Sequence, residues 1–183
     1  MKYLYDLSFD ELKEWCLSQG EPKFRAGQIF AALHNGTSLA DIIGVPNALK
    51  EKISAEFETR LPSPEIIQKS KDGTVKYLLK LNDGKKIECV LLKQDYGNTL
   101  CVSSQVGCRM ACAFCASGKN GLVRNLTCGE ILAEVILINK LNMAEARDQH
   151  ETDGSKKKGT IRAITNIVIM GSGEPFDNYD ETI

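Results

Sequence analysis

Cys108-Arg-Met-Ala-Cys112-Ala-Phe-Cys115 is the stretch from which the fold and chemistry of this chain can be inferred. Its cysteines have the spacing CxxxCxxC. Three thiolates in one short loop hold three irons of a [4Fe–4S] cluster, whereas such clusters usually have four protein ligands. The remaining iron is open to a small molecule, just as a catalytic metal site keeps one coordination position free. The spacing therefore predicts an iron–sulfur centre with Cys108, Cys112 and Cys115 as metal ligands.

Three other uses of these cysteines have to be weighed against a cluster. A disulfide framework is disfavoured because the chain has seven cysteines, an odd number, and no signal peptide. Structural zinc needs a fourth Cys or His at a matching spacing, and the only histidines, His34 and His150, are distant in the sequence. Inert buried cysteines do not suit a segment whose neighbours indicate a loop, namely Arg109, Gly118 and Lys119.

Composition excludes several classes of protein. The chain has 183 residues, of which 43% are hydrophobic and 26% are charged, as in soluble globular proteins. No apolar run is long enough to span a membrane, and the N-terminus lacks the pattern of a secretion or transit signal, so we expect a cytoplasmic protein. The formal net charge of −1 gives no overall basic surface of the kind typical of nucleic-acid-binding proteins.

Residues 1–60 are predicted to form a small helical domain. Ser8-Phe-Asp-Glu11 is a capping box, whose end residues satisfy each other's free backbone amides, and it starts the first helix. Further helices are expected over 24–34 and from Pro46 to about Phe57. Short helices joined by glycine-containing turns resemble a helix-hairpin-helix module, which often contacts nucleic acid, but a simple packing domain fits the residues at least as well.

The hydrophobic period changes to two after Leu61-Pro-Ser-Pro64, which marks a domain boundary. Asn82-Asp-Gly84 is predicted to be the turn of a β-hairpin. Residues 61–98 are therefore assigned to a β-strand extension that connects the helical domain to the core. Its strands are expected over 65–70, 74–81 and 85–92.

The core, residues 99–183, has the order of elements that opens a β/α barrel. A strand over 99–104 enters the cysteine loop, and a second capping box, Thr127-Cys-Gly-Glu130, begins a helix with one apolar face. The continuous apolar run 166–170 predicts a buried parallel strand, and Asp180-Glu181 begins a further helix.

Between that helix and the next strand, residues 144–160 are polar and are expected to be a mobile surface loop. Its lysines 156–158 either contact RNA phosphate or, as is commoner in such loops, are solvated. Two barrel strands cannot close a barrel, so the end at Ile183 leads us to expect the N-terminal part of a longer protein. The predicted fold class is α/β, a partial barrel preceded by the helical domain and the β-hairpin extension.

A glycine-rich segment, Gly171-Ser-Gly173-Glu174-Pro175, follows the second core strand. Glycines let the backbone approach a ligand closely, and the Glu174 carboxylate is an acceptor for a cationic amine. A glycine turn after a strand is usually only a turn. In a β/α barrel, however, this loop would lie at the carboxyl ends of the strands, where ligands bind, together with the cysteine loop.

The cysteine spacing is the hallmark of radical S-adenosylmethionine (SAM) enzymes, and the Gly-Glu loop resembles the one that holds the SAM amine in them. Three further segments resemble one particular family of these enzymes, namely Thr99–Cys108, Gly121–Leu126 and Gly173–Pro175. They resemble the RlmN family of radical-SAM methyltransferases, which modify adenine carbon 2 in 23S ribosomal RNA and tRNA. Lys23–Phe30 and Ser70–Thr74 match the family as well, so the similarity covers essentially the whole chain.

The resemblance implies two cofactors and their binding residues. Cys108, Cys112 and Cys115 would bind the [4Fe–4S] cluster. Gly173 and Glu174 would contact SAM, whose amine and carboxylate would chelate the open iron.

The resemblance also implies two catalytic residues. Cys101 matches a family cysteine that helps resolve the protein–RNA adduct and ends in a transient disulfide with a C-terminal cysteine. Glu88 matches the family's proton acceptor, although an ordinary exposed carboxylate is the better interpretation of Glu88 taken alone. Cys16, Cys89 and Cys128 match no family role and are expected to be small hydrophobic residues.

The implied mechanism uses two SAM molecules. One methylates the C-terminal cysteine, and the other is cleaved at the cluster to a radical that removes hydrogen from the methylcysteine. The resulting methylene radical adds to adenine carbon 2, while the protein supplies placement and excludes water. The implied partners are 23S rRNA, tRNA and an electron donor such as flavodoxin or ferredoxin; a monomer without membrane contact is expected.

The sequence departs from the family because it lacks the methyl-carrying C-terminal cysteine and the later barrel strands that complete SAM binding. This chain alone is therefore expected to be inactive in RNA methylation. Two alternatives remain open. One is the sister family Cfr, which modifies carbon 8 of the same ribosomal adenine; Pro175 favours the carbon-2 family, because Ala is typical there in Cfr. The other is a non-catalytic RNA- or metal-binding module in which the cysteines bind zinc.

Overall fold

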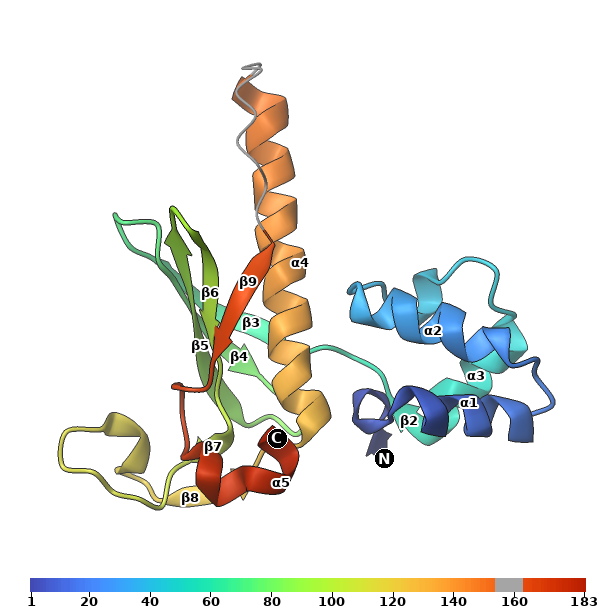
Figure 1. The fold of residues 1–183 in the computed structure, drawn as a ribbon, viewed down its shortest axis with the longest axis horizontal. Coiled ribbons are helices and arrows are strands. Elements are labelled where there is room, and N and C mark those ends of the chain that lie inside the picture. The colour runs from blue at the N-terminus through green and yellow to red at the C-terminus, as the bar shows by residue number, and fades with distance from the viewer. Residues whose placement is uncertain (154–162) are drawn as a thin grey trace.

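The computed structural model describes residues 1–153 and 163–183 and has a mixed α/β architecture, which confirms the predicted class (Figure 1). Lysines 156–158 lie outside the described residues. A five-stranded sheet with the long helix α4 (Cys128–Asp153) along it stands beside a smaller helical domain. In the described part of the chain, no helix is both long and apolar enough to cross a membrane.

The N-terminal domain contains the three predicted helices. The capping box at the start of α1 is present, because Ser8 Oγ accepts from the Glu11 N–H at 3.2 Å and the Glu11 carboxylate accepts from the Ser8 N–H at 2.8 Å. The elements in order are β1 (Lys2–Tyr3), η1 (Leu4–Asp6), α1 (Phe9–Ser18), α2 (Phe24–His34), η2 (Leu39–Asp41), α3 (Asn47–Glu56) and β2 (Phe57–Glu58), and β1 pairs with β2.

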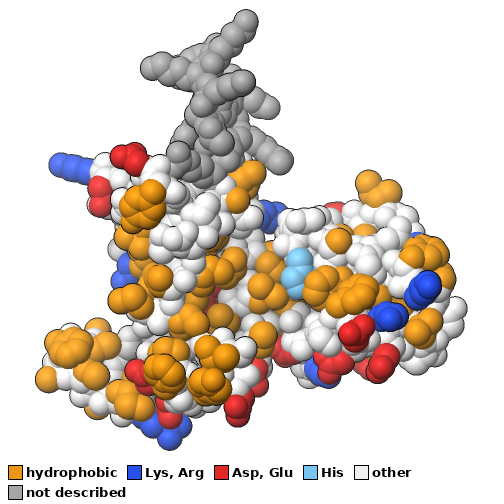
Figure 2. Space-filling view, viewed as in Figure 1, with side chains coloured by type: hydrophobic (Ala, Val, Ile, Leu, Met, Phe, Trp, Pro, Cys, Tyr) orange, Lys and Arg blue, Asp and Glu red, His pale blue; other side chains and the backbone are white. Residues whose placement is uncertain are grey.

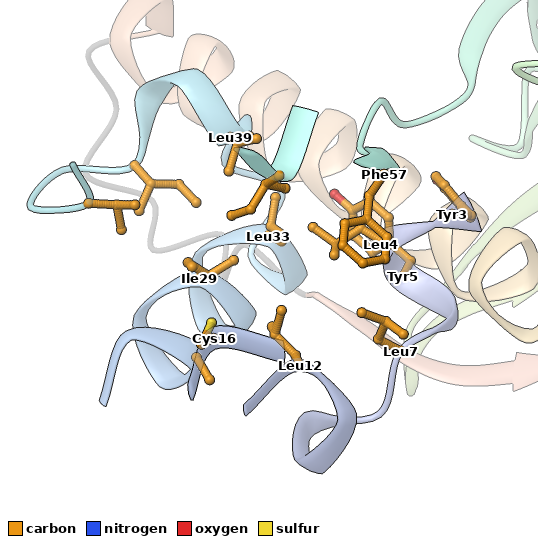
Figure 3. Close-up of a cluster of buried hydrophobic side chains, with 14 of the residues drawn as sticks. Tyr3, Leu4, Tyr5, Leu7, Leu12, Cys16, Ile29, Leu33, Leu39 and Phe57 are labelled. Carbon is orange, nitrogen blue, oxygen red and sulfur yellow. The ribbon is translucent and has the colours of Figure 1, made fainter. Parts of the chain in front are cut away.

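The hydrophobic core of this domain is shared with α4. Leu12 of α1, Ile29 of α2 and Phe57 of β2 belong to the cluster of buried side chains drawn in Figure 3 and are nearly inaccessible to solvent. Ala133 and Ile136 of α4 belong to the same buried cluster. The helical domain is therefore stabilised partly by apolar surface that lies in the other half of the molecule.

The sheet has the strand order β3-β4-β5-β6-β9, in which all pairs are antiparallel except the parallel pair β6–β9. The predicted hairpin turn lies between β4 and β5, where Gly84 has a φ of +82° that favours glycine. The strands are β3 (Ser63–Lys69), β4 (Val75–Lys80), β5 (Lys86–Gln94), β6 (Gly97–Cys101) and β9 (Ile164–Val168).

The helix α4 packs on this sheet through a second buried cluster, in which Ile138 meets strand residues such as Leu79, Leu91 and Leu100. Strand, helix and parallel strand thus form the βαβ unit expected of a barrel opening. The capping box of α4 is also present, since the Thr127 side chain accepts from the Glu130 N–H at 3.2 Å.

Two predictions about this unit were wrong. Of the residues 144–160 that were expected to be loop, 144–153 continue α4 and 154–160 lie outside the described residues. Ala144 and Glu145 favour a helix, and Glu145 pairs with Lys69 and Lys93 of the sheet. The second wrong prediction was that β9 is a buried strand. It is the last strand of the sheet, beside β6, and its Ile167 is 52% exposed.

Short elements complete the fold around the cysteine loop. An antiparallel pair, which the sequence did not predict, closes the base of the loop, and the helix expected from Asp180-Glu181 is present as α5. These elements are β7 (Gln105–Gly107), η3 (Ala116–Gly118), β8 (Leu122–Asn125), η4 (Pro175–Asn178) and α5 (Tyr179–Thr182).

Candidate cofactor site at the ends of β6 and β9

The cysteine loop and the glycine loop start side by side because β6 and β9 are parallel and end at the same edge of the sheet. Cys101 is paired with Val168 at these ends. Beyond the strands the pairing continues, since the Gly171 N–H donates to the Val102 carbonyl at 2.9 Å. The Ser172 carbonyl accepts from the backbone N–H groups of Ser104 (2.9 Å) and Gln105 (3.1 Å). The expectation that the two loops lie together is therefore supported by direct hydrogen bonds.

The glycines of the second loop are required by close packing on the chain itself. A β-carbon at Gly171 would lie 2.7 Å from the Val102 carbonyl oxygen, and one at Gly173 would lie 2.6 Å from Ser104 Oγ. Gly173 also has a φ of +112°. Within the described residues, the buried Ser104 hydroxyl beneath it has no hydrogen-bond partner. The sequence predicted close approach to a ligand, and the structure shows close approach to residues 102–105.

The cysteine loop is a compact turn held at its base. The Cys108 N–H donates to the Gly121 carbonyl at 3.2 Å across the β7–β8 pair, and the Cys115 N–H donates to the Cys112 carbonyl at 3.0 Å. Ala111 has a φ of +49°, and a β-carbon at Gly118 would lie 2.8 Å from its Cα. Cys108 is buried, Cys112 is exposed and Cys115 is half-buried.

The donor chemistry of this loop fits a soft metal centre. Hydrogen bonds from the Ser117 backbone, the Ser117 hydroxyl and the Gly118 backbone lower the pKa of Cys115, and the thiolate is the form that binds metals. Over residues 1–153 and 163–183, no three Cys, His, Asp or Glu side chains are grouped closely enough to hold a metal ion. The assignment of Cys108, Cys112 and Cys115 as cluster ligands stays a prediction.

Side chains also connect the two loops. Ser117 Oγ, two residues after the last cysteine of the motif, lies 3.4 Å from Ser172 Oγ in the glycine loop. Arg109 Nε, one residue after the first, pairs with Asp177 Oδ2 of η4 at 2.8 Å. The loops therefore form one structural unit.

Glu174 caps the short helix that follows it. Its Oε1 accepts a hydrogen bond from the Phe176 N–H at 3.1 Å, so the carboxylate is held at the start of η4. An ionised carboxylate accepts several hydrogen bonds at once, so this cap is compatible with an additional amine donor. The predicted contact of Gly173 and Glu174 with SAM stays a prediction.

Apolar side chains are exposed around the same loops. Figure 2 shows hydrophobic groups gathered over the region in which Figure 1 labels β7, β8 and α5. Exposed residues of these segments are Met110, Phe114, Phe176 and Tyr179, and the rings of Phe176 and Tyr179 are stacked at 6.4 Å.

Glu88 and Cys101 lie on the same face of the sheet. Cys101 is paired with Val90 of β5, and Glu88 is two residues from Val90, so the two side chains are diagonal neighbours. Glu88 Oε1 forms an ion pair of 2.7 Å with Lys76 Nζ of β4. Burial raises the pKa of Cys101, although a backbone hydrogen bond from Met170 acts in the opposite direction.

Two buried polar residues at the site were missed by sequence reasoning. Gln105 and Glu134 are both inaccessible to solvent. Both Glu134 carboxylate oxygens lie 3.2 Å from the Ser103 N–H, and desolvation raises the pKa of Glu134 well above its usual range. The sequence did contain a signal for Glu134. It lies three residues after Ile131 and four before Ile138, and this spacing places its carboxylate on the apolar face of α4.

The expectation for the remaining cysteines is confirmed in part. Cys16 and Cys89 are buried in the two hydrophobic clusters, and burial raises the pKa of Cys89 strongly. Cys128 is exposed instead of buried, because it begins α4 and its backbone N–H donates to the Glu181 carboxylate at 2.8 Å.

Comparison with known proteins identifies the class of enzyme to which this architecture belongs. The chain superposes on the crystal structure of a radical SAM methyltransferase from Sphaerobacter thermophilus with a TM-score of 0.83 and 36% identity, covering all of this chain and 50% of the other. The fold is thus that of part of a radical SAM methyltransferase.

Curated relatives are more specific. The chain is 44% identical over 182 residues to the probable dual-specificity RNA methyltransferase RlmN of Geobacillus kaustophilus, and 43% identical over 179 residues to that of Bacillus cytotoxicus. These alignments cover 98% and 97% of this chain but 46% and 45% of the relatives, so the chain spans about half of their length. No family model matches. The chain is a relative of the RlmN methyltransferases over the part that it spans, as its motifs predicted.

Proposed function

We propose that this chain supplies the cluster-binding and SAM-binding part of an RNA methyltransferase that modifies adenine carbon 2 in 23S rRNA and tRNA. The observation that carries the proposal is the direct hydrogen bonding of residues 171–172, which begin the loop with Gly173 and Glu174. They bond to residues 102–105, which lead into the CxxxCxxC motif, and to Ser117, which follows it. This contact brings the segment that carries the three cysteines and the Glu174 carboxylate, an acceptor for an amine, to one edge of the sheet.

In this proposal Cys108, Cys112 and Cys115 hold the [4Fe–4S] cluster and Glu174 accepts a hydrogen bond from the SAM amine. When bound, these cofactors supply the one-electron chemistry needed to functionalise an inert ring carbon. Gly173 packs closely on Ser104 and Gln105, which lead into the cysteine loop, and this contact supports a fixed position of Glu174 relative to that loop.

Glu88 and Cys101 are proposed to act on the RNA base from the same sheet face. The Glu88 carboxylate accepts the proton that leaves adenine carbon 2, and its ion pair with Lys76 holds it in place. Cys101 stays a protonated thiol until it resolves the protein–RNA adduct, which agrees with its raised pKa. A methyl-carrying cysteine of the whole protein and a flavodoxin- or ferredoxin-like electron donor complete the proposed reaction.

The proposal is tested in cells from which the gene has been deleted. Mass spectrometry of 23S rRNA and tRNA should show loss of 2-methyladenine and its return when the gene is restored, but not when Glu88→Gln is restored. Loss of 8-methyladenine instead would identify the carbon-8 reaction of the Cfr family. Unchanged RNA modification would contradict the proposed function.

A further inference from the structure

We propose that Gln105 is a positioning residue that fixes the SAM-binding loop relative to the cysteine loop. The inference rests on the proposed function, because it assigns Gln105 to the geometry of that same site. Gln105 lies three residues before Cys108, in β7, and its side chain is completely buried.

The side-chain amide of Gln105 uses both of its ends. Its Oε1 accepts a hydrogen bond from the Glu174 N–H at 3.0 Å. Its Nε2 donates to Asp177 Oδ2 at 2.8 Å and to Asn125 Oδ1 at 2.9 Å. One amide therefore holds the backbone of the proposed SAM-binding glutamate, the helix η4 that this glutamate caps, and β8 at the base of the cysteine loop.

Asp177 extends this connection to the cysteines. The same Asp177 oxygen that accepts from Gln105 pairs with Arg109 Nε at 2.8 Å, and Arg109 directly follows Cys108. A charged acceptor makes both hydrogen bonds stronger than bonds between neutral groups. The path Cys108–Arg109–Asp177–Gln105–Glu174 thus links a proposed cluster ligand to a proposed SAM ligand through short contacts.

Burial explains why this arrangement is specific. A buried amide with all of its partners in place has one favourable orientation, because leaving a buried donor or acceptor unsatisfied is costly. Removing the Gln105 amide would leave the Glu174 N–H unpaired and let the loop shift, while the cysteines and their own hydrogen bonds to Gly121 and Ser117 would remain. We therefore expect a loss of SAM affinity with the cluster retained.

The experiment uses the 183-residue chain with its cluster reconstituted anaerobically and reduced. SAM is titrated while the change in the electron paramagnetic resonance spectrum of the cluster is recorded, and iron and sulfide are counted in parallel. Gln105→Ala should weaken SAM binding roughly tenfold to a hundredfold, as the loss of one or two buried hydrogen bonds predicts. Its iron and sulfide content should match the wild type.

A pair of variants separates positioning from simple stabilisation. Q105E keeps an oxygen for the Glu174 N–H but places a carboxylate against Asp177, so it should bind SAM weakly. The double variant Q105E/D177N exchanges carboxylate and amide between the two positions, restores a donor–acceptor pair, and should recover most of the affinity. Asn142→Ala, which removes a buried amide on α4 that is 5% exposed, is the matched control and should leave SAM affinity unchanged.

The outcomes distinguish this inference from the function on which it rests. If the wild-type chain bound a cluster but no SAM, the proposed function would fail and this inference with it. A different result would overturn only the role of Gln105. It is that the wild type binds both cluster and SAM, while Gln105→Ala binds SAM as tightly as the wild type or as tightly as Asn142→Ala. Failure of D177N to recover any affinity lost in Q105E would also overturn it.

Discussion

At the scale of single residues, the fully buried Glu134 connects α4 to the sheet through a hydrogen bond. Its carboxyl accepts from Ser103, whose hydroxyl donates to the Glu88 carbonyl at 2.7 Å and accepts from the Ser172 N–H at 2.9 Å. Through Ser103, the buried Glu134 is thereby connected both to β5, which carries Glu88, and to the glycine loop. Because desolvation disfavours its charge, Glu134 is expected to be protonated in the folded protein.

This raised pKa makes the stability of the protein depend on pH in a defined direction. The folded state holds the Glu134 proton more tightly than the unfolded state, so stability falls as pH rises above the unfolded value of about 4.3 toward the folded pKa. Glu134→Gln removes this loss. As the pH rises through this range, the free energy of unfolding of the variant, measured in urea, should increase relative to that of the wild type. The increase should be up to about 1.4 kcal/mol per pH unit.

Glu130→Gln is the control for this prediction, because Glu130 lies on the same helix but pairs with Arg124 at 2.7 Å near the surface. It should not reproduce the trend. A difference between Glu134→Gln and wild type that stays constant from pH 5 to pH 8 would contradict the burial of a neutral carboxyl.

Gly173 gives a second prediction at this scale. A β-carbon there would lie 2.6 Å from Ser104 Oγ and 2.8 Å from the Gln105 backbone nitrogen, at a φ of +112°. Gly173→Ala should therefore destabilise the protein by on the order of 3 kcal/mol in urea unfolding. Gly84→Ala is the control, because Gly84 also has a positive φ but open space around it, and it should cost about 1 kcal/mol. Equal losses for the two variants would show that the close packing is not as described.

At the scale of elements, local signals in the sequence predicted the beginnings of helices well. Both expected capping boxes are present, because this geometry depends only on residues three apart. They are formed by Ser8 with Glu11 and by Thr127 with Glu130. The continuation of α4 past Met143 could not be predicted, since Glu145 forms its ion pairs with strands distant in the sequence. The exposure of β9 depends on its place at the sheet edge, which periodicity does not encode.

The first capping box predicts a measurable effect on stability. Ser8→Ala removes the acceptor for the Glu11 N–H and should lower the free energy of unfolding by about 1 kcal/mol. Ser8→Asp keeps an acceptor at the N-cap and should stay within about 0.5 kcal/mol of the wild type. A loss of the same size in both variants would argue that the serine acts in some way other than capping.

At the scale of the whole molecule, the helical domain is attached to α4 through a glycine. The Gly129 N–H donates to Asp6 Oδ1 at 2.9 Å, and a β-carbon at Gly129 would lie 2.6 Å from the Asp6 backbone nitrogen. Lys140 adds a hydrogen bond of 2.7 Å to the Gly36 carbonyl. Ala133, which belongs to the core shared with the helical domain, lies one turn further along α4.

Gly129→Ala is therefore expected to loosen the contact between the domain and α4. Hydrogen exchange followed by mass spectrometry should become faster in residues 1–60, while exchange in the sheet changes little. Gly27→Ala on α2 is the control, because a β-carbon there meets open space, and it should leave exchange unchanged or slow it. Unchanged exchange in Gly129→Ala would contradict the close attachment.

The molecule as a whole shows which parts of the site could be predicted from the sequence. The cysteine loop and glycine loop were predicted to meet because parallel strands end at one edge, and the structure has them hydrogen-bonded. The connection through Gln105 and Asp177 could not be predicted, because it joins residues 72 apart whose proximity follows only from the sheet. Residue spacing thus identified the candidate ligands, and long-range packing determined what holds them.

Binding of a [4Fe–4S] cluster by the cysteine loop can be tested in a single reconstitution experiment. The wild-type chain, treated anaerobically with iron and sulfide, should hold about four of each and show the brown absorbance of the cluster. Cys112→Ser should lose it, and Cys128→Ser should retain it, although both cysteines are exposed. Stoichiometric zinc without cluster absorbance, or equal iron content in the two variants, would show that the cysteine loop does not hold a [4Fe–4S] cluster.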